Sequence, residues 1–330
     1  MTEPRISHRA EQLLLLSVSA VVRRLPEPVA LGLGAACGWI AGSVLRIRRR
    51  VVAENLERAF PERTPSWRRK VASACYRHLG REAAALLLLE GMTPAEIRER
   101  CGVSGLDRVH AALAQGRGVL LLTGHLGNWE IGGAAVAANG VPIDVVARIQ
   151  RNRLFEARLR RMREELGMRV VYRHEATRHL LRSLREPRAV ALVADQNAPV
   201  GGLFVDFFGT PAATARGPGL LAARTGAEVL TALVRRLDGH RARYHLAIEP
   251  LDFETAGDPA GDLLALTRAY HAALEAAIRE SPEQYFWFHK RWKTRPDEEE
   301  PGSEGVVPVG PEEGRAMESG PENRTAEDSE

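Results

Sequence analysis

Short apolar segments alternate with helical stretches through the middle of the chain, and this alternation limits the possible folds. The apolar segments have the length of buried strands and occupy residues 119–123, 143–149, 168–172, 189–194, 229–234 and 244–248. The helical patterns lie at 128–139, 152–166, 176–185, 217–225 and 262–280. Strands that alternate with helices of this length form βαβ units with parallel strands. We therefore expect an α/β fold in which helices flank a mainly parallel central sheet.

Length and composition fit one such domain with appendages at both ends. The chain has 330 residues, of which 45% are hydrophobic, enough for a sizeable core. We expect a helical region at 1–50 and an α/β domain at 51–296, whose first part (51–115) is a helical lead-in. The acidic tail at 297–330 is rich in Glu, Gly, Pro and Ser, so we expect it to be disordered.

Charge is distributed unevenly along the chain. The net charge of +4 combines a tail with 12 acidic and two basic residues and a preceding body with a net charge of +14. A body this basic favours an anionic partner: nucleic acid, anionic lipid, or a phosphorylated or acidic carrier. The three cysteines have no CxxC spacing, so we expect neither a disulfide framework nor a zinc site.

Two uncharged runs precede the predicted domain, at 13–22 and 29–45. The second is followed by a cluster of arginines and contains three glycines four residues apart, a spacing that lets helices approach closely in a membrane: Gly34, Gly38 and Gly42. Its 17 residues are the lower limit for a membrane span. Three interpretations remain open: a cleaved secretory signal, a buried helical hairpin, and a membrane-embedded or interfacial anchor. We favour the anchor, with the arginines at the cytoplasmic surface.

The residues after the first strand carry the strongest chemical signal. The segment 123–130 (TGHLGNWE) places His125 just past the carboxyl end of a parallel strand, where open α/β sheets bind ligands. Asn128 is a good N-cap, which puts Glu130 in the first helical turn, where the helix dipole favours a carboxylate. A carboxylate that holds one imidazole nitrogen makes the other a general base. The alternative is an ordinary loop histidine beside a capping carboxylate.

This segment resembles the His-x4-Asp/Glu motif of glycerolipid-type acyltransferases, in the form found in the late acyltransferases of lipid A biosynthesis (the lauroyl/myristoyl acyltransferase family). Further blocks resemble that family in its own order. They lie at 55–61 (NLERAFP), 148–152 (RIQRN), 195–196 (DQ), 204–209 (FVDFFG), 213–214 (AT) and 286–296 (FWFHKRWKTRP). The ordered set covers about residues 10–296. Asn197 departs from the pattern, in which an acid often follows Asp-Gln, and the acidic tail matches no block.

The resemblance implies an O-acyltransferase of the inner membrane whose catalytic domain faces the cytoplasm. Its implied reaction moves a fatty acyl chain from acyl carrier protein to a hydroxyl of a lipid A precursor, with His125 as general base and Glu130 orienting it. The phosphatidylinositol mannoside acyltransferases share the motif and use acyl-CoA, so acyl-CoA-dependent transfer to a glycolipid or phospholipid is the alternative. A catalytically silent membrane-surface binding protein is an alternative from another class.

The resemblance also implies substrate-binding roles for Arg148, Asn152, Asp195, Gln196, Phe207, Phe208, Arg291 and Lys293. Simpler interpretations stand beside these. Asp195 binds the acceptor or supports Arg148, or it caps a helix or turn. The two phenylalanines line an acyl channel or belong to the core. The cationic stretch 289–295 contacts a phosphate or is a solvated surface.

Other chemistries are disfavoured. A Gly-x-Ser-x-Gly elbow is lacking, which weighs against a serine acyl-enzyme, and no metal-ligand spacing occurs, so we expect neither metal nor cofactor. No recognised nucleic-acid motif accompanies the basic residues. The expected partners are the acyl donor, a phosphorylated glycolipid acceptor and membrane lipids.

Overall fold

A computed structural model describes residues 6–173, 176–254 and 257–296, and the predicted acidic tail lies outside this part. Seven of its strands form one sheet, in the order β1-β9-β8-β2-β5-β3-β4. These strands are β1 (Cys101–Ser104), β2 (Val119–Thr123), β3 (Ile143–Ala147), β4 (Met168–Tyr172), β5 (Ala189–Val193), β8 (Glu228–Arg236) and β9 (Tyr244–Pro250). Strands β8, β2, β5, β3 and β4 run parallel, whereas β9 is antiparallel to β8 and carries β1 at the edge. The expected mainly parallel sheet is confirmed.

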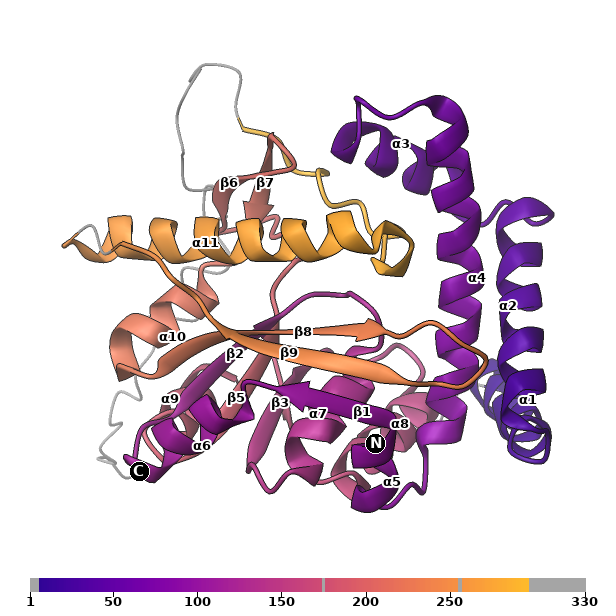
Figure 1. The fold of residues 1–330 in the computed structure, drawn as a ribbon, viewed down its shortest axis with the longest axis horizontal. Helices are drawn as coiled ribbons and strands as arrows, with labels where there is room; N and C mark the ends of the chain where they lie inside the picture. Colours follow the sequence, from indigo (N-terminus) through magenta and orange to yellow (C-terminus); the bar gives the residue numbers. More distant parts are fainter. Residues whose placement is uncertain (1–5, 174–175, 255–256, 297–330) are drawn as a thin grey trace, which may run out of the picture.

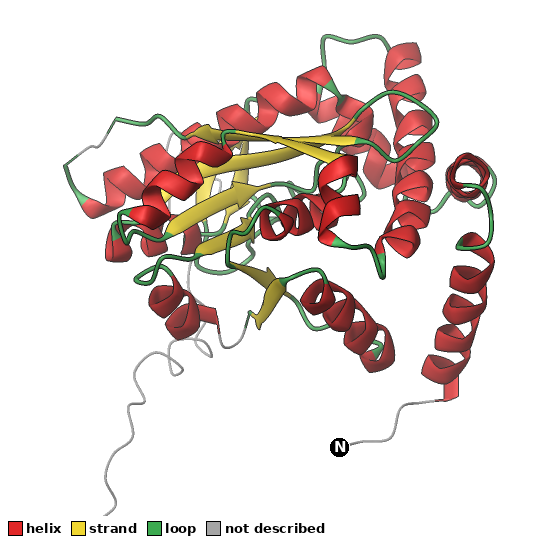
Figure 2. Ribbon diagram, turned by 60° about the horizontal axis from the view of Figure 1, so that its bottom comes forward, coloured by secondary structure: helices red, strands yellow, loops and turns green. Residues whose placement is uncertain are grey.

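Helices cover both faces of the sheet (Figure 1, Figure 2). One face packs against α9 (Ala176–Ser183), α10 (Gly217–Thr225) and α11 (Pro259–Glu280), and the other against α5 (Pro94–Arg100), α6 (Leu106–Ala114), α7 (Trp129–Ala138) and α8 (Arg153–Glu165). Strand β2 shows why two cores form, because side chains of a strand alternate between faces. Leu120 and Leu122 belong to the first core, and Val119 and Leu121 to the second.

The sequence analysis missed three short strands. Strand β1 has four residues, and β6 (Leu203–Phe207) pairs with β7 (Thr210–Thr214) in an antiparallel hairpin that packs on α11. The hairpin turns at Phe208 and Gly209, both with positive φ. A two-residue hairpin turn with positive φ is usually signalled by Asn-Gly or Asp-Gly. Phe-Gly gives no such signal, so this segment looked like a loop.

The first four helices are α1 (Ile6–Val22), α2 (Glu27–Ser43), α3 (Arg49–Ala59) and α4 (Pro65–Leu89). Helix α2 lies along the outer side of α4, away from the sheet (Figure 1). The glycines at 34 and 38 face Gly80 and Tyr76 of α4, where a side chain would overlap the α4 backbone. The glycine spacing that we associated with a membrane therefore serves the contact between two helices of the protein itself.

None of the helices in the described part of the chain is long and apolar enough to cross a membrane. The predicted anchor region does expose many large apolar side chains, which are 42–67% accessible. They are Leu13, Leu14, Leu16, Val18 and Val21 of α1, Val29, Leu33, Trp39 and Ile40 of α2, and Val44, Leu45 and Ile47 after it. Such a concentration is unusual for a surface that faces only water.

We predict that replacing Gly38 by alanine destabilises the protein, because the added methyl group would overlap the carbonyl of Tyr76. Overpacking of this kind costs about 1–3 kcal/mol. Gly32→Ala is the matched control: it lies on the same helix, and its Cβ would meet no atom within 4 Å. Alanine there should stabilise α2 by up to ~1 kcal/mol. Denaturant unfolding followed by circular dichroism measures both changes, and equal effects would contradict the α2–α4 packing.

Candidate active site

His125 and Asp195 follow neighbouring strands at the same edge of the sheet. Strands β2 and β5 pair in parallel, with Thr123 opposite Val193. The N–H of Ala194 continues this pairing by donating to the carbonyl of Thr123 (3.1 Å). His125 and Asp195 each lie two residues beyond the paired residues, so the register places them side by side.

Asp195 contacts His125 at two points. The backbone N–H of His125 donates to Oδ2 (2.8 Å), and its Nδ1 lies 2.6 Å from Oδ1. An ionised carboxylate only accepts hydrogen bonds, so the Nδ1 of a neutral His125 carries the proton and its Nε2 keeps a free lone pair. Asp195 is 2% exposed, which shields the contact from water. This is the arrangement of an oriented general base.

The pKa values of the pair move in the direction this role requires. Burial by itself lowers the pKa of His125, but the charge and hydrogen bond of Asp195, helped by the charge of Glu130, outweigh it and raise the pKa. Burial alone would raise the pKa of Asp195, yet His125 and the positive charge of Arg291 bring it down to about 2. Asp195 is therefore ionised at neutral pH, and His125 is a stronger base than an exposed histidine.

The imidazole packs against two aromatic rings and remains partly accessible. The ring of Trp129 meets it edge-on, with 4.8 Å between centroids, and the ring of Phe286 lies 5.9 Å away. The Nε2 atom is 3.3 Å from the amide nitrogen of Gln196, an exposed side chain. The side chain of His125 is 19% exposed. Its Nε2 is thus the nitrogen that faces the open side of the site.

Glu130 does not make the contact that we expected of it. Its carboxylate accepts two hydrogen bonds from Arg163 of α8 (2.9 and 2.6 Å), and both side chains are largely buried. Within the described residues, the hydrogen bonds of the His125 ring go to Asp195 and Gln196. The orienting carboxylate is therefore Asp195, and Glu130 acts on His125 through its charge. Spacing along the chain did not reveal that α8 supplies Glu130 with an arginine.

The segment 284–294, here called the C-terminal strap, closes over the His125 loop. The N–H of Phe286 donates to the carbonyl of His125 (2.9 Å), and the N–H of Gly127 donates to the carbonyl of Gln284 (3.0 Å). Asn55 of α3 supports the strap from the other side, because its amide donates to the carbonyls of Trp287 and His289 (both 2.7 Å). Three blocks of the sequence resemblance thus meet at one place.

Besides Asp195, three of the predicted binding residues lie inside the protein: Phe207, Phe208 and Arg291. Arg291 is 2% exposed, and its guanidinium donates to the carbonyl of Ala213 and the hydroxyl of Thr214 (both 2.6 Å). Phe207 and Phe208 belong to the first core, so the core interpretation describes their position. These contacts are internal to the fold, and the charge of Arg291 acts on the site at a distance, by lowering the pKa of Asp195.

The other predicted binding residues lie nearer the surface. Arg148 and Gln196 are exposed after β3 and β5, at the same sheet edge as His125, and Lys293 is exposed on the strap. Asn152 caps α8 by accepting from the N–H groups of Leu154 and Phe155, and its amide donates to α1.

Residues that the sequence analysis did not single out complete the site. Arg163 and the roles of Asn55 and Phe286 depend on contacts between distant segments, and no local pattern indicates them. In the part of the chain that the structure describes, no group of three or more His, Cys, Asp or Glu residues is placed to hold a metal ion.

Comparison with known proteins identifies relatives over most of the chain. Residues 2–294 match the family model described as bacterial lipid A biosynthesis acyltransferase. The chain is 31% identical to the lipid A biosynthesis palmitoleoyltransferase of Escherichia coli (strain K12), over 83% of this chain and 88% of the relative. It is 27% identical to the lipid A biosynthesis lauroyltransferase of the same organism, over 86% and 91%. It is also 28% identical to the phosphatidylinositol mannoside acyltransferase of Mycolicibacterium smegmatis, over 82% and 88%.

We predict that the imidazole of His125 titrates above the value of about 6.5 typical of an exposed histidine. In Asp195→Asn the negative charge is gone and burial remains, so the pKa should fall below that value. Asp206→Asn, an exposed carboxylate on β6, is the control and should leave the titration unchanged. Imidazole NMR signals measured against pH test this, with His125→Gln to assign the peak. A pKa that is insensitive to Asp195→Asn would contradict the pairing.

Proposed function

Since the chain belongs to the bacterial lipid A biosynthesis acyltransferase family and is an acyltransferase, we propose that it transfers a fatty acyl chain from acyl carrier protein to a hydroxyl of a lipid A precursor. The observation that carries the proposal is the His125–Asp195 pair at the carboxyl edge of the sheet. The net charge of +14 on residues 1–296 supports it, because the carrier is acidic and the acceptor is phosphorylated.

In the proposed reaction, Nε2 of His125 takes the proton from the acceptor hydroxyl while that oxygen attacks the thioester carbonyl. The tetrahedral intermediate then expels the thiolate as the C–S bond breaks, and the imidazolium returns the proton to the sulfur. Asp195 keeps the imidazole in the required tautomer and stabilises its charged form. A positioned base contributes about 10²–10⁴-fold to the rate.

The remaining site residues have supporting roles in this proposal. Glu130 adds negative charge that favours the imidazolium, and Arg163 fixes its position between α7 and α8. Arg148, Gln196 and Lys293 are exposed and available to the oxyanion, the acceptor phosphate or the carrier.

A second candidate is acyl-CoA-dependent transfer to a glycolipid. The similarity to a phosphatidylinositol mannoside acyltransferase favours it. The two candidates share the catalytic pair and differ in donor and acceptor. Assays with acyl carrier protein and CoA thioesters of the same acyl chain distinguish them.

We further propose that α1 and α2 place the enzyme on the cytoplasmic face of the inner membrane. Both helices carry exposed apolar side chains, and Arg46, Arg49 and Arg50, which follow α2 in the chain, are exposed as well. Apolar side chains next to arginines are typical of segments that lie in the interface of an anionic bilayer.

We predict that His125→Ala lowers the rate of acyl transfer by about 10²–10⁴-fold, because the base is lost. His110→Ala, an exposed histidine of α6, should retain the wild-type rate. Mass spectrometry of the acylated acceptor, with a lipid A precursor and acyl carrier protein thioester, measures both. Transfer by His125→Ala at the wild-type rate would disprove the mechanism, and transfer from acyl-CoA alone would favour the second candidate.

We also predict that replacing Leu13, Leu14 and Val21 together by glutamate abolishes binding to vesicles of phosphatidylethanolamine and phosphatidylglycerol. These side chains are 58–67% exposed on α1, and charge there is incompatible with an apolar interface. The double variant Leu220→Glu and Leu237→Glu, at exposed leucines elsewhere, is the control and should still bind. Co-sedimentation measures this, and unchanged binding of the α1 variant would exclude α1 as the contact.

A further inference from the structure

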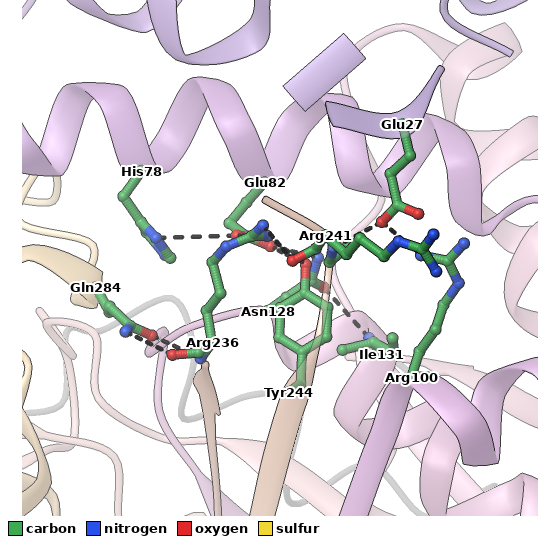
Figure 3. Close-up of polar contacts among 11 residues, drawn as sticks. Glu27, His78, Glu82, Arg100, Asn128, Ile131, Arg236, Arg241, Tyr244 and Gln284 are labelled. Atoms are coloured by element: carbon green, nitrogen blue, oxygen red, sulfur yellow. Dashed lines mark hydrogen bonds and ion pairs between the residues drawn. The ribbon is translucent and has the colours of Figure 1, made fainter. Parts of the chain in front are cut away.

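A buried polar network joins helix α4 to the loop that carries His125 (Figure 3). We call it the Glu82 network: it consists of Glu82 of α4, Asn128 of the loop, Arg236 of β8 and Tyr244 of β9. Each of these side chains belongs to a residue less than a tenth exposed. Asn128 belongs to the His-x4-Glu segment, whereas Glu82, Arg236 and Tyr244 lie outside the blocks of sequence resemblance.

Glu82 accepts a hydrogen bond from each of the other three members. The amide of Asn128 and the hydroxyl of Tyr244 donate to Oε2 (2.9 and 2.6 Å), and the guanidinium of Arg236 donates to Oε1 (3.0 Å). His78 lies 3.8 Å from Oε1, beyond hydrogen-bond distance, and burial lowers its pKa. The position of the carboxylate is thus fixed by three donors from three elements.

Asn128 is held from both ends of its amide. Its nitrogen donates to Glu82, while its oxygen accepts from the N–H of Ile131 and caps α7 (3.2 Å). Asn128 lies three residues after His125 and two before Glu130. Fixing its side chain therefore fixes the start of α7 and the direction in which the chain leaves His125.

The same network reaches the loop by a second route. The backbone of Arg236 exchanges two hydrogen bonds with the side chain of Gln284 (2.8 and 3.0 Å). The backbone carbonyl of Gln284 in turn accepts a hydrogen bond from the N–H of Gly127. Gly127 has a φ of +59°, and a side chain there would overlap the carbonyl of Val234. Hydrogen bonds therefore hold the loop on both sides of Asn128, at Gly127 and at Ile131.

We propose that Glu82 is a positioning residue for the reaction: it holds Asn128, and through it the loop that carries His125. The inference rests on the function proposed above. A buried ion pair is seldom more stabilising than apolar packing of the same volume. Directional contacts that end on the catalytic loop instead define where that loop lies, and displacement by about 1 Å costs on the order of 10²-fold in rate.

Glu82→Gln tests this with minimal change of volume. Glutamine has one acceptor oxygen, whereas Asn128 and Arg236 donate to different oxygens of Glu82, so one of these contacts must be lost. Either loss loosens a route to the loop, because Arg236 reaches it through Gln284 and Gly127. We expect kcat to fall by about 10–100-fold with KM for the donor nearly unchanged. Asn128→Ser keeps an oxygen that can cap α7 but loses the amide nitrogen that donates to Glu82. It should therefore lower kcat by a similar factor. The two substitutions combined should cost less than the product of their separate effects, since both act through the same network.

Glu27→Gln is the matched control. Glu27 is also a largely buried carboxylate beside the network, but it accepts from Arg100 and the N–H of Ala242 and does not contact the loop (Figure 3). Both donors share its Oε1, so glutamine keeps these contacts and removes only the charge beside Arg100, and kcat should be unchanged. Wild-type kcat in Glu82→Gln, or multiplied effects in the double variant, would overturn the inference and leave the proposed function intact.

The NMR signal of His125 gives a readout that does not depend on turnover. Displacement of the loop weakens the contact between His125 and Asp195, so Glu82→Gln should lower the pKa of His125 and shift its signal, whereas Glu27→Gln should not. If the wild type transfers no acyl chain from either donor, the proposed function fails, and the NMR measurement alone then tests whether Glu82 positions the loop. An unchanged His125 signal in Glu82→Gln would then overturn the inference.

Discussion

The parallel pairing of β2 with β5 is the constraint on which the site depends. It places His125 beside Asp195 without any contact local in sequence, because the two residues are separated by 70 positions. The fit is close: a side chain at Gly124 would lie 2.7 Å from Leu274 of α11 and 3.4 Å from Asp195. A slip of one residue in this register would turn Asp195 to the other face of the sheet and leave its charge buried without a partner. The His125–Asp195 pair therefore forms only when the sheet folds in its native register.

Helix α4 connects the apolar surface of α1 and α2 to the loop that carries His125. Its first half contributes Val71, Cys75 and Tyr76 to one core, and its second half contributes Ala84, Ala85 and Leu89 to the other. The helix thus crosses the end of the sheet (Figure 1). On its outer side it carries α2 through a contact that only glycines allow, and on its inner side Glu82 faces the His125 loop. The apolar surface of α1 and α2 and the catalytic loop are consequently fixed to one rigid element.

The sequence predicts the strands of the sheet well because buried strands are continuous apolar runs, and His125 because it follows one of them. It predicts contacts between segments poorly. The assignment of Glu130 as the orienting residue rested on proximity along the chain, and the strand order, which decides that Asp195 is the neighbour, is not encoded in any local pattern. Arg291 was expected at the surface because it lies in a charged stretch, but its guanidinium reaches the backbone of the β6–β7 hairpin, an element the sequence did not reveal.

The buried charges around His125 form a balanced set that suits the proposed chemistry. Glu130 is matched by Arg163 in direct contact, whereas Asp195 and Arg291 act on each other at a distance, since Arg291 binds neutral acceptors. His271 beside Arg291 has its pKa lowered to about 3, first by burial and then by that charge, so it adds no charge of its own. With His125 neutral, these four charged groups cancel. When His125 takes the proton of the acceptor hydroxyl, the new positive charge appears together with the negative charge on the thioester oxygen, so the reaction creates an ion pair and not an isolated buried charge.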